Sequence, residues 1–218
     1  MGRKKLAGLL MAVVTAAMLS GCDGEARVTI SDAEAAKEAL NTASSVYFEG
    51  NLEAVNQDTD ILADGAVAGH MEESGIFNTR WTVTVGGETW FYMKIVTDEP
   101  INDDTEGYVT AATYGYYDEN DNCLGYAQER IVRNEGDYIY FMDADGNLRD
   151  YCMEETGEYV IDMDGNVIAR ADSRADAIGN GCHIQIDMEE GCDMQMDFMD
   201  KMAMYIQQYD ELKFWHSN

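Results

Sequence analysis

The chain is divided by three patterns of apolar and polar residues. Residues 6–18 carry no charge, residues 31–44 begin with polar residues and are then rich in alanine, and from Val46 onward the period is two. Period-two alternation, with β-branched and aromatic residues between clusters of Gly, Asp and Asn, predicts antiparallel strands joined by tight turns. About ten or eleven such strands follow one another, so we predict a mainly β protein with flanking helices.

A helix is predicted on each side of the strands. Ser31 and Glu34 have the spacing of a capping box, which predicts a helix to about Ser44. Near the carboxyl end, spacings of four, three, four and three place these residues on one helical face: Phe198, Met202, Tyr205, Tyr209 and Leu212. We expect this amphipathic helix to pack its stripe on the sheet. A long meander between two helices predicts a barrel, an open half-barrel or a curled sheet.

The clearest hairpin contains Gly86-Gly87, which we interpret as a two-residue turn. Such a turn places Val83 opposite Trp90, and Trp81 opposite Tyr92. Trp81, Trp90 and Tyr92 are then large enough to line a ligand cavity on one face of the sheet. Packing in the core is the more common role of such side chains, and this alternative stays open.

Turns rich in Asp, Asn and Gly join several later strands. We predict them near residues 120–122, at Asp145-Gly146 and at Asp164-Gly165. Both central positions of a type I′ turn need positive φ, and Asp, Asn and Gly adopt it more readily than other residues. The last of these turns places Ile161 opposite Ile168.

Two patterns have the chemistry of metal ligands. The segments that begin at Asp118 and Asp143 space their oxygen ligands as a calcium loop does, but Cys123 and Leu148 stand where that loop needs glycine. A group of methionines suits Cu(I): Met188, Met194, Met196, Met199, Met202 and Met204. Met202 and Met204 lie on opposite faces of one helix, so these two side chains cannot bind the same ion. We therefore favour hairpin turns and core packing over calcium or copper sites, and predict no cofactor.

Four cysteines follow Cys22 along the chain, and an even number in an exported protein permits two disulfides. The sequence does not choose among the three possible pairings. We favour Cys182 with Cys192, and Cys123 with Cys152, because each pair could lie on neighbouring strands. Free buried thiols are the alternative.

The amino-terminal segment has the pattern of an export signal. Basic residues 3–5 precede the uncharged residues 6–18, which are too short to span a membrane as a helix. Leu-Ser-Gly-Cys at residues 19–22 resembles the lipobox of bacterial lipoproteins. The resemblance implies cleavage after Gly21 and attachment of fatty acyl groups such as palmitate to Cys22.

This resemblance implies a domain organisation and a location. Several acyl chains hold a protein stably on a membrane, so the mature protein would be lipid-anchored at the cell membrane and face outside the cytoplasm. The organisation is then a signal peptide (1–21), a lipidated Cys with a short tether (22–30) and a single extracytoplasmic domain (31–218).

The net charge and the lack of recognisable catalytic motifs narrow the classes of function that we expect. The chain has 14 Lys+Arg and 42 Asp+Glu, and the signal peptide holds three of the basic residues and none of the acidic ones, so the mature charge is −31. Such a protein repels nucleic acids and stays soluble. His70, His183 and His216 lie in no recognisable catalytic motif, and we predict that the protein is not an enzyme.

The order of elements also resembles the half-barrel lipoproteins of the LolA and LppX type. This resemblance implies a concave face that holds acyl chains beneath helices, and it carries no binding residue over. We therefore expect a membrane-tethered, non-enzymatic module that binds an apolar ligand or a partner. The alternative is an acidic interaction scaffold with a filled core that recognises a basic protein.

Overall fold

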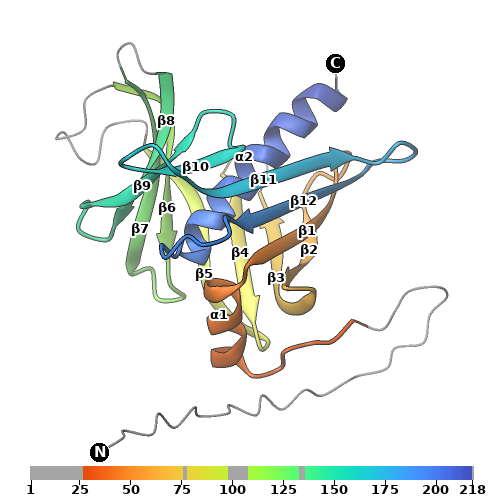
Figure 1. Cartoon of the computed structure of the whole chain (residues 1–218). Helices are drawn as coiled ribbons and strands as arrows, with labels where there is room; N and C mark the ends of the chain where they lie inside the picture. The colour runs from red at the N-terminus through yellow and green to blue at the C-terminus, as the bar shows by residue number, and fades with distance from the viewer. Residues whose placement is uncertain (1–26, 76–77, 98–107, 133–135, 218) are drawn as a thin grey trace, which may run out of the picture.

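The sheet is a closed antiparallel barrel (Figure 1). The computed structural model describes residues 27–75, 78–97, 108–132 and 136–217, and these contain twelve strands and two helices. The strands are β1 (Ser45–Asn51), β2 (Asp58–Ala63), β3 (Ala66–Ser74), β4 (Arg80–Val85), β5 (Glu88–Thr97), β6 (Tyr108–Tyr117), β7 (Cys123–Val132), β8 (Gly136–Asp143), β9 (Leu148–Glu154), β10 (Tyr159–Asp162), β11 (Val167–Ala175) and β12 (Gly181–Met188).

Pairing of the first strand with the last closes the barrel. Val46 of β1 lies opposite Ile186 of β12, and Phe48 lies opposite Ile184. All four side chains are buried, so this pairing makes the apolar inner face continuous around the sheet. The prediction of a mainly β fold is confirmed. The prediction of a half-barrel or curled sheet is wrong, because the first and last strands pair with each other instead of remaining edges.

The first helix, α1 (Ala33–Thr42), packs on β2, β3 and β4. Its N-cap is Asp32, whose carboxylate accepts a hydrogen bond from the Ala35 amide at 2.9 Å, so Ser31 does not have the capping role predicted for it. Leu40 is fully buried in the core. Gly86 approaches this helix so closely that a Cβ atom there would lie 2.9 Å from the Cβ of Ala33.

The first half of the second helix, α2 (Phe198–His216), lies inside the barrel, and its exposed carboxyl-terminal end projects out of it (Figure 1). Residues 200–206 are all buried, so every face of the helix is covered. Phe198 stacks on Trp90 of β5 at 5.5 Å, and Tyr205 stacks on Phe48 of β1 at 4.4 Å. The carboxyl-terminal helix and the burial of its predicted apolar stripe are therefore confirmed, and the remaining faces of the helix are buried as well over residues 200–206. A twelve-stranded lumen is wider than side chains alone can fill, and a helix about 10–12 Å across fits there.

Buried polar groups fix the start of α2 to the barrel wall. The Tyr151 hydroxyl donates to Oδ2 of Asp200 at 2.7 Å, and Arg149 lies 2.9 Å from the same carboxylate and 2.6 Å from that of Asp197. Burial raises the pKa of Asp200 to about 7, although the positive charge of Arg149 opposes the shift. Oδ2 of Asp200 and the Asp197 carboxylate thus meet donors on β9.

Lys201 of α2 connects this helix to α1 by hydrogen bonds. Lys201 is buried, and its Nζ donates to the carbonyl oxygens of Leu40 at 3.2 Å, Asn41 at 3.4 Å and Ala43 at 3.5 Å. These are the carbonyl groups that the end of a helix leaves without partners, and a cation is favourable beside them. Burial lowers the pKa of Lys201 to about 8.

A β-bulge changes the predicted pairing of the central hairpin. Gly86 and Gly87 have φ of 58° and 83°, which confirms the two-residue turn. Beyond the turn the register shifts, so Val83 lies opposite Phe91 instead of Trp90. Trp90 is the extra residue of the bulge. The predicted pairings of Val83 and Trp81 are therefore wrong by one residue.

The Asp-rich turns share one hydrogen-bonding pattern. The carboxylate of Asp143 accepts from the amides of Asp145 and Asn147, each at 2.9 Å, and from the side-chain amide of Asn147. Asp118 and Asp162 make the corresponding contacts with Asn122 and Asn166. These hydrogen bonds lower the pKa of all three aspartates.

The turns lie where the sequence predicts them, but their type differs. A hydrogen bond from the Gly165 amide to the Asp162 carbonyl (3.0 Å) and the positive φ of Gly165 define a three-residue loop instead of a type I′ turn. The extra residue places Ile161 opposite Val167, so its predicted pairing with Ile168 is wrong.

Asp200→Asn should change how stability depends on pH. The folded pKa of Asp200 is raised, so its contribution to stability is fully present below about pH 4 and is lost as the pH rises through about 7. The wild type should therefore lose stability relative to the variant by about 1.4 kcal/mol per pH unit across this window. Urea unfolding of both proteins between pH 4 and pH 8 measures the difference. Asp172→Asn, which removes an exposed carboxylate, is the control, and a constant difference between wild type and Asp200→Asn would contradict the prediction.

Candidate functional site

The three aromatic residues predicted to line a cavity do not lie together. Trp81 is buried on the inner face of β4, and Trp90 stacks on Phe198 of α2. Tyr92 lies on the outer face of β5, where the Arg80 guanidinium is 3.5 Å from the centre of its ring. The space beside Trp90 is filled by the protein's own helix, and Trp81 packs edge-on against Tyr114 of β6 at 5.8 Å.

The predicted disulfides are not formed in the structure, and Cys22 lies outside the described residues. Cys123 is on β7 and Cys152 is on β9, and β8 separates them, so the assumption of neighbouring strands fails for this pair. Burial raises the pKa of Cys152 and of Cys182 to about 11. Both thiols are therefore protonated at neutral pH and are poor nucleophiles.

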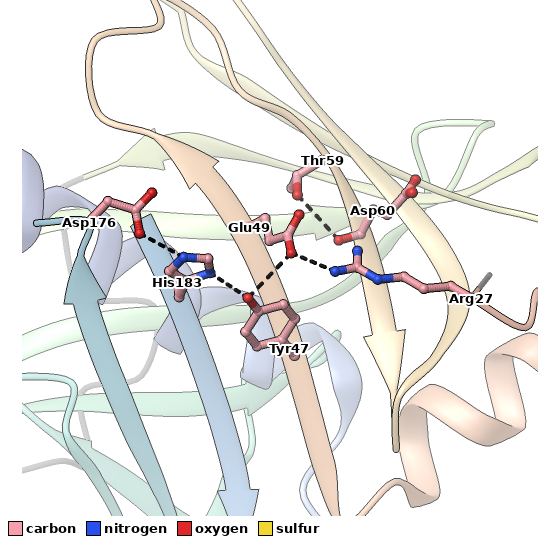
Figure 2. Close-up of polar contacts among 7 residues, drawn as sticks. All are labelled: Arg27, Tyr47, Glu49, Thr59, Asp60, Asp176 and His183. Atoms are coloured by element: carbon pink, nitrogen blue, oxygen red, sulfur yellow. Dashed lines mark hydrogen bonds and ion pairs between the residues drawn. The ribbon is translucent and has the colours of Figure 1, made fainter. Parts of the chain in front are cut away.

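A chain of polar side chains crosses the outer wall over β12, β1 and β2 (Figure 2). Asp176 lies 2.9 Å from Nε2 of His183, and Nδ1 of His183 makes a short hydrogen bond with the Tyr47 hydroxyl. The same hydroxyl is 3.4 Å from Glu49, which also accepts from Arg27 at 2.7 Å. These hydrogen bonds thus link the β11–β12 turn to Arg27, the first residue that the structure describes.

The single hydroxyl hydrogen of Tyr47 limits the directions of the hydrogen bonds around it. The Tyr47 hydroxyl has one hydrogen, which it donates to Glu49 at 3.4 Å, and its oxygen can also accept a hydrogen from Nδ1 of His183. Nε2 on the other side of the His183 ring lies 2.9 Å from Asp176, so the ring bridges the phenol and a carboxylate. Burial raises the pKa of Tyr47, and the hydrogen bond from Arg27 lowers the pKa of Glu49. A neutral phenol donates and accepts hydrogen bonds and an ionised carboxylate accepts them, so both groups can bind and orient a partner.

A polar cleft of about 500 Å³ adjoins this chain. It is lined by Arg27, Glu49, Gln57, Asp58, Asp60 and His70, among others. His70 lies between two carboxylates, with Nε2 2.9 Å from Asp58 and Nδ1 3.2 Å from Asp60. The cleft therefore offers carboxylate oxygens from two strands at a surface accessible to a partner.

The segment that carries Arg27 belongs to the barrel. The Ile30 amide donates to the Val67 carbonyl at 2.8 Å, and the Val67 amide donates to the Val28 carbonyl at 2.8 Å. The last residues of the predicted tether, 28–30, therefore pair with Val67 of β3. The β-branched pair Val28-Thr29, which favours extended backbone, is the signal in the sequence that could have indicated this pairing.

The metal-ligand candidates have other contacts. Met196, Met202 and Met204 are buried in the core. The carboxylates of Asp118, Asp143 and Asp162 are occupied by the hydrogen bonds of their own turns. One further group of acidic residues in the described part brings carboxylate oxygens within 4.8 Å of one another: Glu129, Asp137 and Glu155. We assign no ion to it, because partly exposed acidic residues often gather in a chain this acidic.

Comparisons with protein-family models, curated proteins and solved structures found no match. Within the described ranges, no helix has both the length and the apolar character needed to span a membrane.

Arg27→Gln should raise the pKa of Glu49 toward the usual range for glutamate, because it removes the charged hydrogen bond that lowers this pKa. Amide hydrogen exchange at Ile30 and Val67 should become faster, since the ion pair holds residues 27–30 against the wall. Carboxyl ¹³C NMR titration and exchange measurements test both effects. Arg170→Gln, which removes an exposed arginine paired with Glu189, should leave Glu49 unchanged. An unaltered Glu49 titration in Arg27→Gln would refute this account of the site.

Proposed function

We propose that the protein is a membrane-tethered, non-enzymatic binding module that faces outside the cytoplasm and recognises a basic partner through the outer wall of its barrel. The observation that carries this proposal is the occupation of the lumen by α2. An apolar ligand in the lumen would have to displace a helix that aromatic stacking and buried ion pairs hold in place. The wall is the surface that remains for recognition.

The path of the first described residues supports a defined orientation. Cys22 lies five residues before Arg27, and five extended residues reach roughly 17 Å. Arg27 is held to Glu49 at the polar cleft. If Cys22 is acylated, the cleft is therefore close to the membrane surface, and a partner would bind there beside the lipid.

The charge of the wall supports the choice of partner. Glu49, Asp58 and Asp60 line the cleft in a mature chain of charge −31. A field of one sign repels anionic headgroups and nucleic acids and speeds the encounter with a basic protein. Carboxylates that converge on one cleft add a defined place for a lysine or arginine side chain.

Cys22→Ala should release the protein from membranes, because the proposed lipid is attached to that thiol. The wild type should partition into the detergent phase of a two-phase extraction, and the variant should lose this partitioning. Cys192→Ala is a control, because this cysteine lies far along the chain from the lipobox. Equal partitioning of wild type and Cys22→Ala would contradict a lipid anchor.

Asp58→Asn/Asp60→Asn should weaken binding of a short polylysine peptide to the chain from Asp23 onward. The expected loss is roughly tenfold, since two charged contacts are removed. Fluorescence anisotropy at physiological salt gives the affinity. The control, Asp172→Asn/Glu190→Gln, changes the net charge equally at exposed positions elsewhere on the surface.

Two results would count against the proposed function. An equal loss in both double variants would show that the peptide responds to diffuse charge and not to the cleft. Reproducible co-purification of lipid with the chain from Asp23 onward would favour a ligand in the lumen instead.

A further inference from the structure

A second groove on the outer wall is cationic and aromatic. It lies over β4, β5 and β6, has a volume of about 660 Å³, and its lining includes Asn78, Thr79, Arg80, Tyr92, Lys94 and Tyr117. This volume is within the usual range for small-molecule sites, about 300–1,000 Å³. The groove is separate from the cleft at Arg27, which lies over β1, β2 and β3.

Strand register places the cations and the rings side by side. Arg80 lies directly opposite Lys94, and Tyr92 lies directly opposite Tyr117. The Arg80 guanidinium is 3.5 Å from the centre of the Tyr92 ring, and Lys94 Nζ is 4.4 Å from the centre of the Tyr117 ring. The two tyrosine rings stack at 5.4 Å with 21° between their planes. Arg80, Lys94 and Tyr117 reach the surface, and Tyr92 is buried against them; we call these four residues the cationic shelf.

Gly115 allows the shelf to be flat. A Cβ atom at Gly115 would lie 2.7 Å from the ring of Tyr117, so this ring occupies the space above a residue without a side chain. Tyr117 therefore lies across β6 instead of standing away from it. Lys94 pairs with Gly115 in the sheet, and this brings its amine over the same ring.

The charges of the shelf are not neutralised by the described part of the protein. Like charges directly opposite each other on neighbouring strands are unfavourable. Nevertheless, Arg80 and Lys94 take part in none of the ion pairs found among the described residues, in a chain with 42 acidic residues. The nearby carboxylate of Asp121 accepts a short hydrogen bond from the Tyr92 hydroxyl, so it is engaged by the phenol. Two unneutralised cations beside each other in so acidic a chain favour an anion as the missing partner.

We propose that the cationic shelf binds a small acidic sugar, with its oxyanion between Arg80 and Lys94 and the flat face of its ring on Tyr117. A guanidinium binds a carboxylate or a phosphate through paired hydrogen bonds, while an ammonium group adds a point charge. The partly exposed ring of Tyr117 covers the apolar face of the sugar ring, and Asn78 and Thr79 offer hydrogen bonds to hydroxyl groups. This site goes beyond the proposed function and depends neither on the tether nor on the cleft.

Three probes with the same ring separate the contributions: glucuronate, glucose 6-phosphate and glucose. Titrated into the ¹⁵N-labelled chain from Asp23 onward, at least one anionic sugar should shift the amide signals of Arg80, Lys94 and Gly115 in a saturable way. Glucose should not. The tighter of the two anionic sugars identifies carboxylate or phosphate as the preferred group.

Matched variants test the assignment of residues. Arg80→Gln and Lys94→Gln should each raise the Kd at least tenfold, and Tyr117→Leu should raise it severalfold. Arg170→Gln removes the same charge beside another wall tyrosine, Tyr159, and should leave the Kd unchanged, as should Asp58→Asn/Asp60→Asn. Unchanged affinity in the two shelf variants, or no saturable shift with either anionic sugar, would overturn the proposal. Inorganic phosphate bound as tightly as glucose 6-phosphate would overturn the role of the ring.

Discussion

Closure of the sheet is the constraint on which the rest of the structure depends. Once β1 pairs with β12, twelve inner strand faces surround a lumen that side chains do not fill by themselves. A helix is the element that fills such a space while satisfying its own backbone hydrogen bonds. Because α2 takes this place, its polar side chains are buried together with its apolar ones, and each needs a partner on the wall or on α1.

The buried polar contacts give the helix one position in the lumen. Apolar packing alone tolerates rotation and sliding, whereas Asp200 meets Arg149 and Tyr151 in one placement only. Further along the helix, Tyr209 accepts a hydrogen bond from Gln57 at 2.7 Å and donates to the Asn51 carbonyl at 3.1 Å. The raised pKa of Asp200 and the lowered pKa of Lys201 are the electrostatic consequences of this burial.

The sequence predicts local structure well and long-range structure poorly, for a physical reason. Glycine needs positive φ only in particular turns, so the Gly86-Gly87 turn follows from the residues themselves. Nothing local indicates that Trp90 is the extra residue of a bulge, because its contact is Phe198, more than a hundred residues later. The row of polar side chains on the wall likewise depends on contacts between residues that are far apart in the sequence. Tyr47 and His183 are 136 residues apart, and only barrel closure brings them together.

The same closure explains why the outer wall suits recognition. Each strand of an antiparallel barrel presents alternate residues inward and outward, and here the inward set is held by α2 and the core. Outward residues on those strands, such as Tyr47, Tyr92 and Tyr117, are therefore fixed in position before any partner arrives. Pre-organised side chains lose little conformational freedom on binding, which favours affinity. An acidic cleft over β1–β3 and the cationic shelf over β4–β6 thus occupy neighbouring parts of one barrel wall, so the two proposed sites would bind groups of opposite charge at separate places.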